Sequence, residues 1–130
     1  MSIRLRIIRE RAETIRNWRS HAQKIAGAAT EVLGEETEVY AFGSAVRGEA
    51  TPSSDVDLLI VVNGTIPSLK VRNRMMMMVE EAAGLGDFHP FEIHVVGSEE
   101  AAPYFRHAGR DMIALGRRRP AGNVRRRTIA

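Results

Sequence analysis

The stretch from Ala41 to Val62, AFGSAVRGEATPSSDVDLLIVV, constrains the fold of this chain more than any other. A short apolar run ends at the Gly43-Ser44 pair, and a loop rich in Gly, Thr, Pro and Ser follows. Asp55 and Asp57 then stand at the start of a strongly apolar run, which is typical of a buried strand. The stretch therefore predicts two strands joined by a loop, with a phosphate-binding turn and a cation-binding pair of acids close together.

The flanking patterns predict helices and one further strand of a small sheet. Apolar side chains recur at steps of three or four from residue 3 to 33, which predicts one amphipathic helix, or two end to end. In chain order we then expect a strand at 38–42, a short helix at 44–46 and a strand at 55–62. A helix capped by Ser68 and running to 83, a strand at 91–96 and a final helix at 99–115 follow. This order predicts an α/β (α+β) fold with a short mixed sheet flanked by helices.

Composition places the chain among globular proteins. Its 130 residues are enough for one domain that buries roughly two-thirds of its unfolded surface. We expect residues 1–116 to form that domain and the Arg-rich residues 117–130 to be a disordered tail. No apolar run reaches the roughly 18 residues of a membrane span, and no secretory signal is recognisable, so we expect a cytoplasmic protein. The absence of cysteine leaves only oxygen or imidazole ligands for a metal.

Charge is distributed unevenly along the chain. Residues 1–20 carry a net charge of +4, residues 21–116 carry −7, and residues 117–130 carry +6. The overall charge of +3 and the isoelectric point near 9.9 thus come from the two ends, while the central body is acidic. Contact with nucleic acid is expected only through the tail. The alternative is that the tail contacts only the solvent. The apolar stripe of the first helix is long for so small a body, so part of it either packs in the core or contacts a partner.

Three acidic residues are candidate metal ligands. Side chains two apart in a strand project to one face, so Asp55 and Asp57 would point the same way with Cβ atoms roughly 7 Å apart. Glu92 lies inside the apolar run FEIHVV, where a buried carboxylate needs a metal or an arginine as its partner. If that strand lies beside 55–62, Glu92 completes a cluster of three carboxylates. Otherwise Glu92 is a strand-end residue that faces the solvent.

The Gly43-Ser44 turn is the candidate phosphate site. Gly43 allows close approach of the backbone, and the Ser44 hydroxyl with the following amides can bond phosphate oxygens. Arg47 either neutralises charge on the phosphates or ties the loop to an acid. His94 lies two residues beyond Glu92 and shares its face. It either touches the substrate or, as we expect, is a histidine satisfied within the sheet.

The segment GSAVRGEATPSSDVDLLIVV, with ten residues between Ser44 and Asp55, resembles the signature of the DNA polymerase beta-type nucleotidyltransferase superfamily. The short length and the Arg47-Gly48 pair resemble its minimal nucleotidyltransferase branch, although many minimal members have Arg where Ala45 stands here. The resemblance implies the small nucleotidyltransferase fold, with Gly43, Ser44 and Arg47 binding a nucleoside triphosphate. It also implies that Asp55, Asp57 and Glu92 hold two Mg²⁺ ions and catalyse transfer of a nucleoside monophosphate.

The resemblance further implies a partner. Minimal members are commonly paired with a small helical toxin of the HEPN class, whose tyrosine they adenylylate. The resemblance thus implies an antitoxin that transfers AMP from ATP to a hydroxyl of a partner protein within an oligomer. Because the chain ends soon after Glu92, we expect the partner to supply the acceptor surface. A binding module without catalysis and a small-molecule nucleotidyltransferase are the alternatives.

Overall fold

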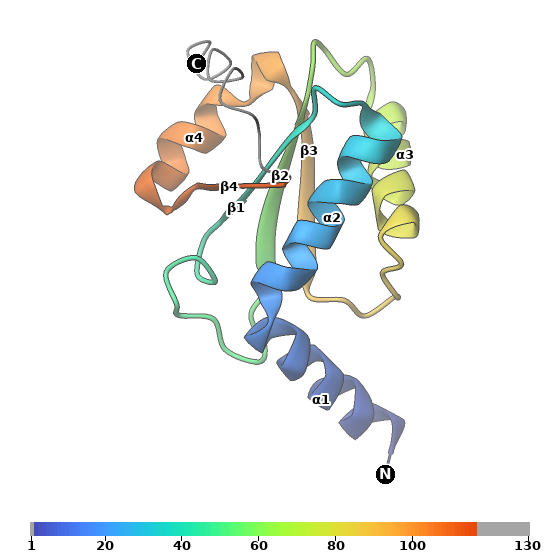
Figure 1. The fold of residues 1–130 in the computed structure, drawn as a ribbon, viewed down its shortest axis with the longest axis vertical. Helices are drawn as coiled ribbons and strands as arrows, with labels where there is room; N and C mark the ends of the chain where they lie inside the picture. The colour runs from blue at the N-terminus through green and yellow to red at the C-terminus, as the bar shows by residue number, and fades with distance from the viewer. Residues whose placement is uncertain (1, 117–130) are drawn as a thin grey trace.

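A four-stranded mixed sheet forms the centre of the protein in the computed structural model, which describes residues 2–116 (Figure 1). The strands are β1 (Glu38–Phe42), β2 (Val56–Val62), β3 (Phe91–Gly97) and β4 (Ile113–Leu115), in the spatial order β3-β2-β1-β4. β2 pairs with β3 in parallel, while β1 pairs antiparallel with both β2 and β4. The expected α/β fold with a mixed sheet is confirmed, and the expected tail at 117–130 lies outside the described residues.

Two helices cover one face of the sheet. α2 (Trp18–Leu33) and α3 (Leu69–Ala82) lie side by side on this face in Figure 1 and pack on β1, β2 and β3. Inward-facing residues of the strands, such as Leu58, Ile60 and Ile93, form the main core with Ile25 and Val79 from the helices. α3 begins as predicted, because the Ser68 hydroxyl accepts a hydrogen bond from the Val71 amide.

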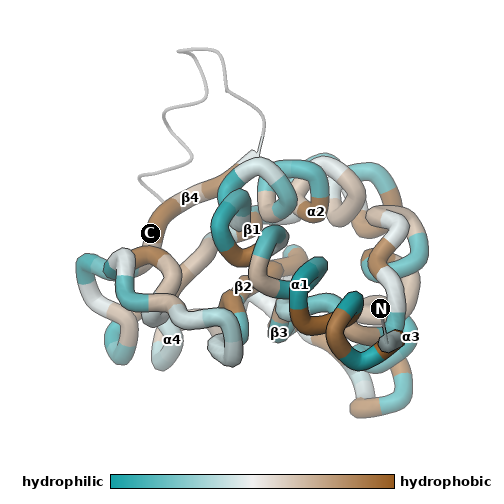
Figure 2. The backbone as a smooth tube through the Cα atoms, turned by 90° about the horizontal axis from the view of Figure 1, so that it is seen from below, coloured by the Kyte–Doolittle hydropathy of each residue, from teal (hydrophilic) through white to brown (hydrophobic). Residues whose placement is uncertain are grey.

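The first helical segment divides at Asn17 into α1 (Ile3–Arg16) and α2. α1 is at the N-terminus of the chain and projects away from the sheet in Figure 1. Hydrophobic and hydrophilic residues alternate along it in Figure 2. Its apolar residues Ile3, Leu5 and Ile8 are 68%, 56% and 51% exposed, whereas Ile15 is buried. Only the end of the helix near α2 therefore contributes to the core among residues 2–116. None of the described helices is long and apolar enough to cross a membrane.

The end of the chain differs from the prediction of one helix over 99–115. Ser98–Glu100 forms a 3₁₀ turn (η1), α4 spans only Ala102–Ala108, and a second 3₁₀ turn (η2, Gly109–Asp111) leads into β4. Gly109 has a φ of 59°, so the chain leaves the helix there. The predicted helix is wrong because the edge of β1 offers hydrogen bonds to residues 113–115, which the local apolar spacing cannot reveal.

The second face of the sheet is only partly covered. Its alternate strand residues include Leu59, Val61 and Val96, which form a small cluster with Ala101. Tyr104 from α4 packs against this cluster. At the opposite end of this face, where β2 and β3 begin, the side chains become polar, and the candidate site lies there.

Candidate active site

Strand register brings two of the predicted acids face to face. Asp57 of β2 is the direct partner of Glu92 in the parallel ladder with β3. Residues opposite each other on adjacent strands project to the same face, so both carboxylates lie on the face away from α2 and α3. Burial raises the pKa of the Asp57 carboxyl, and the neighbouring Glu92 raises it further. The pair is thus an acidic site whose charge repulsion a bound cation would relieve.

His94 completes this group, and the sequence-based expectation of a histidine satisfied within the sheet is wrong. Its Nε2 lies 3.6 Å from Asp57 Oδ1 and is buried without a hydrogen-bond partner among residues 2–116. The imidazolium form of His94 opposes the rise in the pKa of Asp57. The signal in the sequence was the two-residue spacing from Glu92, which places both side chains on one face.

The three residues have the chemistry of a metal site. One ligand atom from each of Asp57, Glu92 and His94 can be chosen so that all three lie within 4.8 Å of one another. Two carboxylate oxygens and an imidazole nitrogen are suitable ligands for a divalent cation. The residues therefore fit a metal ion such as Mg²⁺, whose remaining ligands would be water and phosphate oxygens.

Asp55 lies outside this group. Its Oδ1 accepts a hydrogen bond of 2.8 Å from Arg11 Nη2 of α1, and the same Nη2 donates to the Ser54 carbonyl at 2.9 Å. Asp55 precedes β2, so its backbone is in the loop and not in the ladder. The structure thus brings Asp57 and Glu92 together and places Asp55 beside an arginine that the sequence reasoning did not connect with it.

The Gly43-Ser44 turn lies directly against Asp57. Gly43 has a φ of 90°, and a Cβ at this position would lie 2.7 Å from Asp57 Oδ2. Only glycine fits this approach without displacing the carboxylate. The predicted short helix at 44–46 is wrong, since residues 44–48 form successive turns with hydrogen bonds such as Val46 N to Gly43 O at 3.1 Å. Ala45 is buried in the main core.

Arg47 borders a hollow of about 240 Å³ next to the turn. Gly43, Asp57 and Asp111 also line it. Arg47 donates to Glu49 at 2.9 Å and to Asp111 at 3.2 Å, and these bonds, with that to Glu49 first, raise the pKa of its guanidinium. Arg47 thus ties the turn to η2 and keeps its positive charge beside the hollow.

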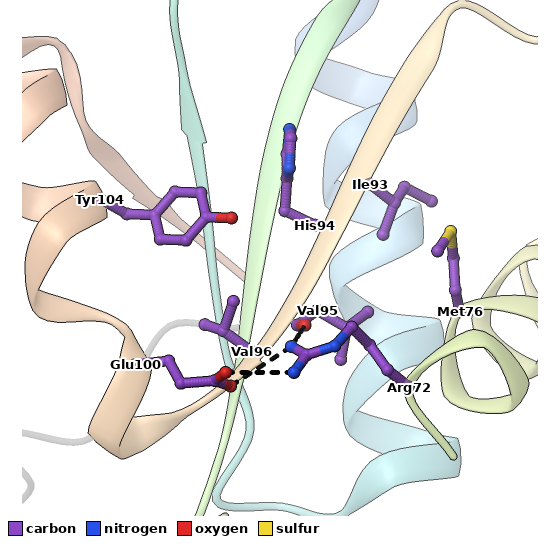
Figure 3. Close-up of a pocket in the computed structure, with 8 residues that line it drawn as sticks. All are labelled: Arg72, Met76, Ile93, His94, Val95, Val96, Glu100 and Tyr104. Carbon is purple, nitrogen blue, oxygen red and sulfur yellow. Dashed lines mark hydrogen bonds and ion pairs between the residues drawn. The ribbon is translucent and has the colours of Figure 1, made fainter. Parts of the chain in front are cut away.

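A larger hollow of about 480 Å³ lies along β3 on the far side of His94, between α3 and α4 (Figure 3). Arg72 crosses its floor and donates to the Val95 carbonyl at 2.6 Å and to Glu100 at 3.1 and 3.2 Å. The pair of bonds from Arg72 is the main reason that the pKa of Glu100 is lowered. His94 also lines this hollow, so the hollow borders the acidic group at that residue.

This chain is similar to several known proteins. The sequence profile of the nucleotidyltransferase domain family matches residues 22–100, which is more than half of the chain. Spectinomycin 9-adenylyltransferases of Staphylococcus aureus are 38% identical over 69 residues, 51% of this chain but 26% of their own length. The chain thus spans about a quarter of the curated relatives it matches. A Sulfolobus solfataricus crystal structure described as a nucleotidyltransferase aligns with 23% identity and a TM-score of 0.49, over 78% of this chain and 85% of that one.

Proposed function

This chain belongs to the nucleotidyltransferase domain family, and we propose that it transfers AMP from ATP to a hydroxyl group with the help of Mg²⁺. The observation that carries the proposal is the pairing of the Asp57 and Glu92 carboxylates on neighbouring strands, directly against the Gly43-Ser44 turn. A triphosphate on the turn would place its phosphates beside two acids that need a cation. The same motif carries the family resemblance in the sequence.

Each residue has a proposed role. Gly43 and Ser44 would bind the β and γ phosphates. Arg47 lines the neighbouring hollow and would add positive charge near the same ligand. Asp57, Glu92 and Asp55 would hold two Mg²⁺ ions. When bound, such ions neutralise charge on the phosphate oxygens and on the attacking oxygen. Asp55 would share its carboxylate between Arg11 and this role.

Glu92 is the proposed general base. It is the exposed member of the pair, so an acceptor hydroxyl can reach its carboxylate oxygen and transfer its proton there. The acceptor oxygen forms a bond to the α-phosphorus, and the bond from that phosphorus to the β-bridging oxygen breaks. Pyrophosphate leaves, and the acceptor keeps AMP. In-line attack requires the acceptor to approach opposite to the leaving pyrophosphate.

For the acceptor we propose a tyrosine of a HEPN-class toxin, which would make the chain the antitoxin of a toxin-antitoxin pair in the cytoplasm. The resemblance to the minimal branch supports this. The exposed apolar residues Ile3, Leu5 and Ile8 of α1 give further support, because they are available to contact a partner in a hetero-oligomer. A protein that only blocks its partner by contact would use the same surface without needing Asp57.

A small hydroxylated molecule is the second candidate for the acceptor. The match to spectinomycin 9-adenylyltransferases favours it, since these relatives are named for transfer to a small molecule. The hollow of about 480 Å³ next to His94 is in the size range of small-molecule sites. The matched part covers only 26% of those enzymes, so their substrate is carried over here as a proposal alone.

The test is intact-mass analysis of the acceptor after incubation with ATP and Mg²⁺. The full chain is co-expressed with a HEPN-class partner, or the purified chain is mixed with spectinomycin. We expect a mass increase of one adenylyl group on the partner protein and none with Asp57→Asn. The matched control is Glu31→Gln, an exposed carboxylate of α2 outside the acid cluster, which should retain transfer. If Asp57→Asn still neutralises the toxin completely, catalysis is not the function.

A further inference from the structure

We propose that His94 is a direct metal ligand, so that the site of Asp57, Glu92 and His94 binds a transition-metal cation of the Mn²⁺ class more tightly than Mg²⁺. The inference rests on the proposed function in placing a cation at this site. It goes beyond that function in the identity of the ligand set and in the class of metal that the set selects.

The Nε2 atom of the His94 ring is in a position that a metal ion would satisfy. Nε2 is buried, and no hydrogen-bond partner lies within reach of it among residues 2–116. A buried polar atom left unpaired costs about 1–3 kcal/mol, and coordination of a metal ion removes this cost for an imidazole nitrogen. Asp57 Oδ1 lies 3.6 Å from it, which is longer than a hydrogen bond. A cation between the two would bond both.

The distances between the three side chains suit a single ion. Metal–ligand bonds to carboxylate oxygen and imidazole nitrogen are about 2.0–2.2 Å, so ligand atoms around one ion lie roughly 3–4 Å apart. The 3.6 Å between His94 and Asp57 is within that range, and all three ligand atoms are within 4.8 Å of one another. The three ligand atoms therefore need only a small side-chain adjustment to close around an ion.

Two aromatic rings hold the imidazole of His94 in place. The His94 ring lies 5.6 Å from the Phe42 ring and 5.7 Å from the Tyr104 ring, measured between centroids. Figure 3 shows Tyr104 and His94 extending into the same space from α4 and β3. A ligand whose orientation is fixed before binding loses less entropy when the ion arrives.

The class of metal follows from the ligand set. Mg²⁺ prefers oxygen ligands throughout, whereas imidazole raises affinity for first-row transition metals. Asp55, which would supply a third carboxylate, is bonded to Arg11, so fewer free anionic oxygens are available to favour Mg²⁺. Two carboxylates and one nitrogen with water and phosphate completing the shell suit Mn²⁺, which accepts six ligands including oxygen.

The test measures binding of Mn²⁺ and, separately, of Mg²⁺ to the full chain without nucleotide, by calorimetry and by the loss of the free Mn²⁺ EPR signal. We expect wild type to bind Mn²⁺ more tightly than Mg²⁺. His94→Gln should weaken Mn²⁺ binding by about tenfold or more while changing Mg²⁺ binding little. The control His89→Gln removes a histidine outside the group and should leave both affinities unchanged. Equal Mn²⁺ affinity in His94→Gln and wild type would overturn the proposal.

A second readout does not depend on the variant folding. When the wild-type protein is titrated with Co²⁺, the ring protons of His94 should show large paramagnetic NMR shifts, while those of His89 stay near their metal-free positions. Unshifted His94 signals at saturation would refute direct ligation. The two proposals fail separately. If His94→Gln loses the selectivity for Mn²⁺ over Mg²⁺ but wild type adenylylates no tested acceptor, His94 is a metal ligand and the proposed transferase function is wrong. If His94→Gln keeps that selectivity and wild type does transfer AMP, the function holds and His94 is not a ligand.

Discussion

Replacing Asp57 with Asn should raise the thermal stability of the metal-free protein, although it removes a residue proposed to be essential for transfer. Asp57 and Glu92 are direct neighbours across β2 and β3, and both are carboxylates. Like charges placed directly opposite each other in a sheet destabilise it. Asn has nearly the same shape as Asp and no charge, so the substitution removes the repulsion and preserves the packing.

The magnitude follows from the exposure of the pair. Cross-strand pairs change stability by roughly 0.2–1 kcal/mol, and solvent screens this pair because the Asp57 side chain is 26% exposed and Glu92 is exposed. We therefore expect a gain of about 0.5 kcal/mol, which corresponds to a rise in Tm of about 2 °C for a domain of this size. Removing the partly buried charge itself acts in the same direction.

The pH dependence has a definite sign. Burial and then Glu92 raise the pKa of Asp57 in the folded state, so the folded protein binds this proton more tightly than the unfolded chain does. The associated stability is present at low pH and is lost as pH rises through the folded-state pKa. The advantage of Asp57→Asn over wild type should consequently be largest near neutral pH, should shrink as the pH falls through the folded-state pKa of Asp57, and should disappear below the unfolded-state pKa of about 3.9.

The assay is thermal unfolding followed by circular dichroism in the presence of a chelator, at neutral and mildly acidic pH. Asp55→Asn is the matched control, because this acid is paired with Arg11 at 2.8 Å. Its loss should lower stability by up to about 1 kcal/mol, the opposite sign. In saturating Mn²⁺ the Tm of wild type should exceed that of Asp57→Asn, because a bound ion stabilises only the protein that can bind it. A lower Tm for Asp57→Asn in chelator at neutral pH would refute the reasoning.

Three glycines give further predictions, all checked by thermal unfolding. Gly97→Ala should destabilise the protein by about 1–3 kcal/mol, because its Cβ would lie 2.3 Å from the Gly64 carbonyl oxygen. Gly27→Ala should stabilise it by roughly 0.5–1 kcal/mol, since this exposed position of α2 has no atom within 4 Å of the new Cβ; a loss of stability would contradict this. Gly43→Ala should cost about 1–2 kcal/mol from its φ of 90° and also weaken ATP binding in a Mg²⁺-dependent titration, as the new Cβ displaces Asp57. Unchanged ATP affinity would show that the turn does not hold the phosphates.

Local signals in the sequence predicted most of the fold. β1 has the predicted bounds, and β2 and β3 each differ from theirs by one residue, because apolar runs bounded by Gly, Pro and Asn specify short buried strands. The hydroxyl of Ser68 defines the start of α3. Where the prediction is wrong, over 99–115, the apolar spacing fits a helix, but Gly109 and the free edge of β1 decide the outcome. Edge pairing between residues more than seventy positions apart, such as Val39 and Leu115, leaves no local pattern.

The candidate site was predictable as far as it depends on strand alternation. Asp57, Glu92 and the face they share follow from two apolar runs and the assumption that they are neighbours. The surroundings of His94 depend on Tyr104 of α4 and on Phe42 at the end of β1. These contacts join three separate parts of the chain, so the environment of the imidazole could not be read from its own strand.

The two aspartates of one motif have opposite electrostatic surroundings, and this difference explains how the acidic site is tolerated in the folded protein. Asp57 faces another carboxylate, whereas Asp55 faces Arg11, which α1 brings from 44 positions away in the sequence. Three uncompensated carboxylates together would repel one another more strongly than two. By pairing with one of them, Arg11 limits the repulsion to the pair that a cation can relieve. α1 thus contributes to the charge balance of the site even though most of its length lies outside the core.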